Sequence, residues 1–199
     1  MKTWWKKGLI AWSSIFVLIG TANAGLLVEP YLGYRFSVSG SVEKIVDGVT
    51  EDISFSNFEA GGRLGWIFSS ISAGVDYNWK TPTMEFSGGS SLDSTVTNLG
   101  AFIGIHLGSR KQWIIRGKYF FMSDLTADSS ATGIADGDAL SGAGYGADLG
   151  YKFLDWLAIN LEYSMVTYDE HNGYELKTSD LLVSLSFPFE FFGERSSRY

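Results

Sequence analysis

The 199-residue chain contains no cysteine and only three prolines and two histidines. Without cysteine it can form no disulfide and offers no thiol nucleophile. A catalytic nucleophile and base would have to use His106 or His171. Beyond residue 24 no stretch approaches the roughly 20 apolar residues that a spanning helix needs. Any membrane crossing must therefore be made by strands.

The first 24 residues have the features of a removable signal peptide. Three lysines precede an apolar run over 8–20, and Ala22-Asn23-Ala24 supplies the small residues of a cleavage site. A short membrane anchor is the alternative, but the apolar run is brief. Cleavage after Ala24 would leave 12 basic against 22 acidic side chains, a formal charge of −10. This charge argues against a nucleic-acid partner.

From residue 25 the chain repeats segments in which apolar residues alternate with small or polar ones. This period of two indicates strands with one apolar face. The eight predicted strands are 26–37, 54–68, 71–80, 96–108, 111–123, 138–154, 157–168 and 177–191. Short connections alternate with longer polar ones over 38–53, 81–95, 124–137 and 169–176. The pattern predicts an all-β protein, an eight-stranded antiparallel up-and-down transmembrane β-barrel over 25–192, followed by a short tail over 193–199.

The register of each strand follows from its apolar parity. Odd-numbered residues face the lipid in the third to eighth strands, and even-numbered residues do so in the first two. Aromatic residues gather near the strand ends, as expected for the two interfacial girdles of a membrane barrel. A soluble β-sandwich is the alternative, but it would have to bury tryptophans such as Trp79 and Trp113 at strand ends.

The opposite parity carries charges of both signs. The predicted inward residues are Glu29, Arg35, Glu59, Arg63, Asp76, Lys80, Arg116, Lys118, Asp148, Lys152, Glu162 and Glu190. Six acids face six bases. Eight strands enclose room only for side chains, so these groups are expected to pair and close the lumen. A narrow channel for ions or small solutes is the alternative, for which a lining of one sign would be the better signal.

The predicted outer loops are acidic. Their acids are Glu43, Asp47, Glu51, Asp52, Glu85, Asp93, Asp124, Asp128, Asp136, Asp138, Asp169, Glu170, Glu175 and Asp180, against Lys44 and Lys177. Asp136 and Asp138 are the densest candidates for a divalent cation, but the spacing of a full calcium loop is missing, so solvated loop acids are favoured. No cofactor is expected.

The chain resembles the small outer-membrane β-barrel proteins of Gram-negative bacteria, of the OmpA and OmpX type. The resemblance covers Gly25 to about Phe192, and it rests on the opening 28–36, VEPYLGYRF, and the aromatic closing stretch 187–192, FPFEFF. It implies a monomer in the outer membrane, in contact with lipid and lipopolysaccharide and inserted by the barrel-assembly machinery. Whether the assembly signal is the closing stretch or Tyr199 stays open.

The predicted role is structural or adhesive, with a closed lumen and acidic loops that could bind an extracellular ligand. An enzyme that modifies lipid A is a further alternative, because such enzymes use the same fold. The chain lacks the His-x-Ser arrangement expected near the membrane edge, so no catalytic residue is assigned.

Overall fold

The computed structural model of the protein describes residues 24–44, 49–131 and 134–192. Apart from Ala24, which begins the first strand, the predicted signal peptide lies outside the described residues, as does the predicted tail 193–199. The ten strands of the described part are β1 (Ala24–Lys44), β2 (Val49–Phe68), β3 (Ile71–Lys80), β4 (Thr83–Phe86), β5 (Ser91–Leu107), β6 (Trp113–Ala127), β7 (Ala139–Leu154), β8 (Leu157–Tyr168), β9 (Tyr174–Ser186) and β10 (Phe189–Phe191).

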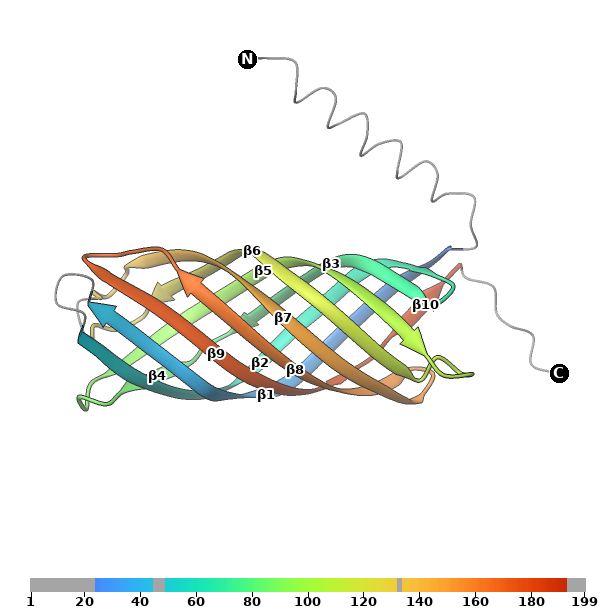
Figure 1. Cartoon of the computed structure of the whole chain (residues 1–199), viewed down its shortest axis with the longest axis horizontal. Helices are drawn as coiled ribbons and strands as arrows, with labels where there is room; N and C mark the ends of the chain where they lie inside the picture. Colours follow the sequence, from blue (N-terminus) through green and yellow to red (C-terminus); the bar gives the residue numbers. More distant parts are fainter. Residues whose placement is uncertain (1–23, 45–48, 132–133, 193–199) are drawn as a thin grey trace, which may run out of the picture.

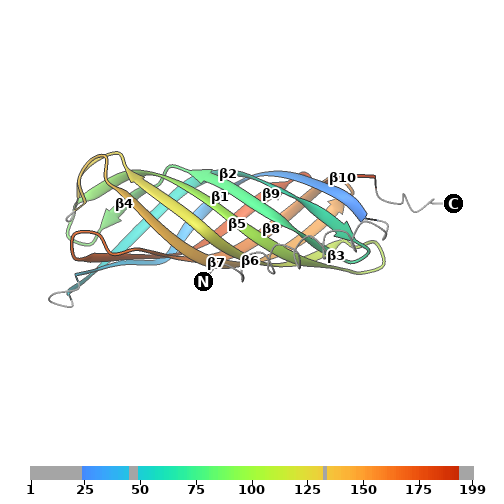
Figure 2. The same cartoon turned by 90° about the horizontal axis from the view of Figure 1, so that it is seen from above.

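The strands form one sheet that closes on itself (Figures 1 and 2). Neighbours along the chain pair antiparallel, and β1 pairs with β2 on one side and with β9 on the other. β3 and β4 both lie between β2 and β5, and β9 and β10 both pair with β1. Each of these two pairs therefore forms one interrupted wall strand. The predicted eight-stranded antiparallel barrel is confirmed.

The three prolines lie where the wall is interrupted. Pro82 separates β3 from β4, and Pro188 separates β9 from β10. Pro30 lies in β1 opposite the second interruption, where its carbonyl accepts a hydrogen bond from the Phe187 N–H at 2.9 Å. Proline has no N–H to donate to a ladder, so these positions lose little pairing.

The two ends of the barrel differ. The connections over 69–70, 108–112 and 155–156 are short, and the beginning of β1 and β10 lie at the same end (Figure 1). We call this the turn end. The opposite end is the loop end: β1 ends and β2 begins there, β6 ends and β7 begins there, and it carries the connections over 87–90 and 169–173. Several predicted loops are shorter than expected, because β1 extends to Lys44, β5 begins at Ser91 and β6 extends to Ala127.

Between the turn end and the middle of the barrel, the wall is apolar outside. Leu32 is 57% exposed, Ile103 61% and Tyr145 63%, although each is a large apolar or aromatic side chain. Such a continuous exposed belt is the lipid-facing surface of a membrane barrel. No helix among the described residues is long and apolar enough to cross a membrane.

Towards the loop end the polarity of the two faces of the wall is reversed: the inner face becomes apolar and the outer face polar. In β5, Leu92 and Val96 point inward and are buried, whereas Asp93 and Thr95 reach the outer surface. The inward apolar residues form one cluster, the outer cluster, of Val42, Ile53, Phe55, Met84, Phe86, Leu92, Val96, Phe120, Leu125, Ala127, Ala131, Ile134, Leu140, Val166, Tyr168 and Leu176. This part of the wall is therefore built like a soluble barrel, which explains why the predicted loops continue as strands.

A β-bulge changes the register in β6. Pairing with β7 jumps from Phe120 to Ser123, and Phe121 and Met122 both point outward. Beyond the bulge the odd residue Leu125 is buried. The prediction that odd residues face outward along this whole strand is therefore wrong beyond residue 121, because sequence parity does not reveal the extra residue.

Candidate functional site

The middle of the lumen is filled by a layer of buried charges from seven strands. This charge layer consists of Glu29, Arg35, Glu59, Arg63, Asp76, Lys80, Arg116, Lys118, Asp148, Glu162 and Asp180. None is more than 5% exposed. Ten of the twelve residues predicted to form the lumen network lie in it. Alternation along the strands places them there, because each inward position lies between two lipid-facing ones.

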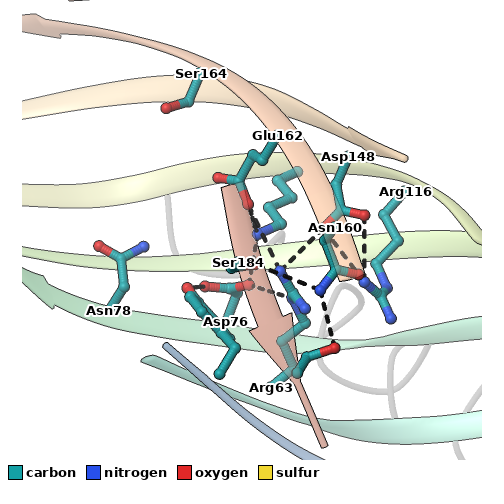
Figure 3. A network of polar contacts seen from close by, with 12 residues as sticks. Arg63, Asp76, Asn78, Arg116, Asp148, Asn160, Glu162, Ser164 and Ser184 are labelled. Carbon is teal, nitrogen blue, oxygen red and sulfur yellow. Dashed lines mark hydrogen bonds and ion pairs between the residues drawn. The ribbon is translucent and has the colours of Figure 1, made fainter. Parts of the chain in front are cut away.

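Arg63 lies at the centre of the half of the layer nearer the turn end. Its guanidinium donates to Glu29 Oε1 at 2.8 Å, to Asp76 Oδ2 at 2.9 Å and to Asp148 Oδ2 at 3.0 Å. Figure 3 shows Arg63, Asp76 and Asp148 pointing toward one another from different strands. One cation thus joins β1, β2, β3 and β7 across the lumen.

Two further cations complete this half. Arg116 Nη2 donates to Glu29 Oε2 at 2.6 Å, and Lys118 Nζ lies 2.8 Å from Asp76 Oδ2. Lys118 also donates to Glu162. The carboxylates are therefore shared between cations, an arrangement that offsets part of the desolvation cost of each group.

Arg35 organises the half nearer the loop end. Its guanidinium donates to Glu59 and Asp180, and to Ser164 Oγ at 2.7 Å. Lys80 Nζ donates to Asp180 Oδ2 at 3.3 Å. Asp180 was predicted to be a loop acid, and that prediction is wrong: the residue is 1% exposed in β9. Its strand begins at Tyr174 and keeps even residues inward as far as Ser186, so residue 180 points into the lumen.

Lys152 and Glu190 do not join the charge layer. Lys152 Nζ lies 3.3 Å from Glu190 Oε1 at the turn end, where the Glu190 side chain is 43% exposed. The two residues form a separate pair at the rim because β7 and β10 approach their ends there.

Tyr31, which was not among the predicted site residues, also lies inside the charge layer. The Arg63 guanidinium carbon lies 4.4 Å from the centroid of its ring, and its hydroxyl donates to Asp76 Oδ1 at 3.0 Å. Gly61 makes room for the ring, since a Cβ there would lie 2.4 Å from Tyr31 Cζ. Its inward parity was the available signal, but tyrosine is also common on the lipid face.

The layer holds six acids and five bases. The Oε1 atoms of Glu59 and Glu162 have no hydrogen-bond partner in the described structure. Arg116 Nε also lacks a hydrogen-bond partner there. Because the acids of the layer outnumber its bases by one, removal of a base should cost more than neutralisation of an acid.

Uncharged layers fill the lumen on either side. Towards the turn end, Asn160 Nδ2 donates to Ser186 Oγ at 2.9 Å, and Leu27, Ile67 and Phe102 pack together. Towards the loop end, Asn98 Nδ2 donates to Asn78 Oδ1 at 2.8 Å. The outer cluster lies beyond it. Side chains of three kinds therefore occupy successive levels of the lumen.

The loop end is acidic on its outer surface. Its acids among the described residues all reach solvent: Glu43, Glu51, Asp52, Glu85, Asp93, Asp124, Asp128, Asp136, Asp138, Asp169, Glu170 and Glu175. Several also bond the wall and loops, as when Thr95 Oγ1 donates to Asp128 Oδ2 at 2.9 Å and Ser141 Oγ donates to Asp124 Oδ1 at 2.9 Å. Asp124 and Asp128 are thus held in place by hydrogen bonds from neighbouring strands. Asp47 lies outside the described residues.

The two candidate metal ligands do not converge. The Asp138 carboxylate accepts from the Ala135 N–H at 2.8 Å and lies 2.9 Å from His171 Nε2, and these two contacts hold the pKa of Asp138 below its usual value. Asp136 is exposed. The described residues contain no group of three or more acidic or histidine side chains arranged to hold a metal ion.

The other histidine lies in the lumen. His106 Nε2 is 3.0 Å from Ser72 Oγ, and Ser72 is 0% exposed. A serine enclosed in this way cannot reach a lipid substrate outside the wall. The contact between His106 and Ser72 is therefore part of the packing of the lumen.

No family model matches the chain, and no curated protein does either. Among solved structures it is similar to Ail, the attachment invasion locus protein of Yersinia pestis, in complex with the heparin analogue sucrose octasulfate. The identity is 16% over 83% of this chain and 99% of Ail, with a TM-score of 0.55. It is also similar to Neisserial surface protein A, with 12% identity over 83% of this chain and 99% of that one, and a TM-score of 0.53. The likeness confirms the fold of the small outer-membrane β-barrels, and with the apolar belt it supports the predicted location in the outer membrane.

Proposed function

We propose that the protein is a non-conducting outer-membrane barrel that presents its acidic loop end at the cell surface, in a structural or adhesive role. The observation that carries the proposal is the filled lumen. The charge layer lies between an apolar group at the turn end and the outer cluster at the loop end. The surface left for interaction is the loop end, where twelve described acids face solvent beside Lys44 and Lys177.

The charge of this surface favours a cationic partner. Ail, with a similar fold, is described with a heparin analogue, a polysulfated anion. The loop end of this chain would repel such a ligand unless divalent cations bridged the two. We infer that a partner would carry basic groups, and that contact with lipopolysaccharide would also require divalent cations.

Single-channel conductance of the refolded chain 25–199 in a planar bilayer tests the closed lumen. The wild type should be silent, because the apolar outer cluster lies across the lumen at the loop end of the described residues. The Arg116→Ala variant, checked for folding by its heat-modifiable gel shift, should stay silent as well. Steady conductance of the wild type that Arg116→Ala alters would make the protein a channel.

A cell-adhesion assay tests the proposal that the acidic loop end binds a cationic partner. Cells displaying the protein should adhere to a polylysine-coated surface more than cells without it. The triple variant Glu85→Gln, Asp136→Asn and Glu170→Gln should reduce this adhesion, because all three residues are exposed at the loop end. Glu190→Gln, at the turn end, is the control and should have no effect. Equal adhesion of all variants would contradict a role for the acidic surface.

A further inference from the structure

A cavity of about 240 Å³ opens at the turn end, between the β5–β6 turn and the β7–β8 turn. It is lined by Arg110, Gln112, Tyr151, Lys152, Phe153, Leu154 and Asp155. Cationic, anionic and aromatic side chains thus share one small hollow. None of them belongs to the charge layer.

Gln112 connects the two cationic walls of the cavity. Its backbone carbonyl accepts from the Lys152 N–H at 2.8 Å, and its side-chain Oε1 accepts from the Arg110 N–H at 3.2 Å. The Lys152 side chain is 10% exposed and lies beside Glu190, whereas Arg110 is exposed on its turn. The backbones that carry both cations are therefore fixed relative to one another.

The cavity borders the lipid-facing wall. Tyr151 is 37% exposed and Phe153 47%. The centroid of the Tyr151 ring lies 4.7 Å from the centroid of the Trp113 ring on β6. Amphipathic rings of this kind lie at the level of lipid head groups. The cavity is thus at the depth where the phosphates of the adjacent leaflet are found.

We propose that this cavity binds the head group of an ethanolamine phospholipid. The phosphate would lie against Arg110 and Lys152, since guanidinium and ammonium groups bind phosphate oxygens with charge-assisted hydrogen bonds. The primary ammonium would lie against the Asp155 carboxylate. A choline head group has no N–H to donate to Asp155, and a glycerol head group has no cation to place there.

Native mass spectrometry of the detergent-solubilised, refolded chain tests the proposal. The protein is titrated with ethanolamine, glycerol and choline phospholipids of identical acyl chains. The ethanolamine lipid should bind most tightly. Arg110→Ala should weaken its binding about tenfold, the effect of losing one charge-assisted hydrogen bond. Asp155→Asn should remove the preference for ethanolamine over choline lipid.

Lys111→Ala is the matched control. Lys111 adjoins Arg110 but does not line the cavity, and its Nζ donates to the Ser69 carbonyl at 2.5 Å. It should leave lipid binding unchanged. An equal loss in Lys111→Ala and Arg110→Ala, or equal affinities for the three lipids, would overturn the proposal, as would tightest binding of the glycerol lipid.

Soluble glycerophosphoethanolamine separates two sources of the same head group. If it displaces the lipid at equal concentration, the head-group chemistry is supported and the ligand is a free phosphodiester. If it does not, the acyl chains contribute and the ligand is the membrane lipid. Gel-shift analysis of every variant confirms that the barrel has folded.

Discussion

At the scale of single residues, removal of different buried charges should lower the free energy of unfolding by different amounts. Arg35 forms ion pairs with three acids, Glu59, Asp180 and Glu162. Glu59 contributes only Oε2 to a hydrogen bond. Because the layer already holds one more acid than base, each lost base leaves buried carboxylates uncompensated.

We therefore expect Arg35→Met to lower the free energy of unfolding by about 3–5 kcal/mol. Glu59→Gln, which keeps the shape and removes one negative charge, should cost about 1 kcal/mol. Urea titration of the refolded protein in lipid vesicles measures both. Similar losses for the two variants would show that the excess of acid has no energetic role.

The contact between Asp138 and His171 predicts a pH effect at the loop end. The Ala135 N–H, and after it His171, lower the pKa of Asp138 below its ordinary value of 3.8. A lowered pKa means that the ionised carboxylate stabilises the folded loop above the ordinary value, and that this contribution disappears as the pH falls through the folded pKa.

The carboxyl carbon shift of Asp138, followed by NMR against pH, should give a midpoint below 3.8. His171→Ala should raise the midpoint only part of the way, because the Ala135 N–H still donates to the carboxylate. A midpoint unchanged by His171→Ala would remove the histidine from this explanation.

At the scale of elements, the bulge in β6 makes one residue dispensable. Phe121 and Met122 together face a single residue of β7, since Phe120 pairs with Gly144 and Ser123 with Gly142. Deleting Met122 restores regular alternation and keeps Ser123 and all later residues on their present faces.

The Met122 deletion should therefore refold with the wild-type gel shift. Deletion of Gly117, in a regular stretch of the same strand, should prevent folding, because it moves every residue on one side of it to the wrong face. Two variants that behave alike would mean that the bulge does not determine the register of this strand.

The sequence predicts the part of each strand near the turn end and the middle of the barrel better than the part near the loop end. In β3 the alternation is strict, so the inward positions of Asp76 and Lys80 could be read directly. Around Leu92 the apolar residues point inward instead, and this stretch was assigned to the polar loop 81–95. Asp180 lies in the predicted strand 177–191 on its inward parity, so its place in the lumen could have been read from the sequence, although it was counted among the loop acids. The pairings inside the charge layer depend on interstrand register, which parity along one strand does not contain.

At the scale of the whole molecule, the positions of the turns and chain ends predict which end of the barrel faces the periplasm. The short turns and both ends of the described chain lie at the turn end, the arrangement in which short turns face the periplasm. Because the chain lacks cysteine, a single introduced thiol can report its side.

We expect Ser91→Cys, at the loop end, to react with a membrane-impermeant maleimide on intact cells. Ser109→Cys, on the β5–β6 turn, should react only after the outer membrane is permeabilised. Both serines are exposed, so access to the reagent depends on the side of the membrane. Labelling of Ser109→Cys alone on intact cells would reverse the orientation.

The exchange of faces along the wall also sets how much bilayer the protein can match. In β5 the outward apolar run extends from Leu99 to Leu107, and the next outward residue, Thr97, is polar. For a strand tilted by about 45° this run covers about 20 Å along the membrane normal. A typical hydrocarbon core is about 30 Å thick. The mismatch beside β5 is relieved if the lipids next to this strand shorten, so the bilayer is expected to thin on this side of the barrel.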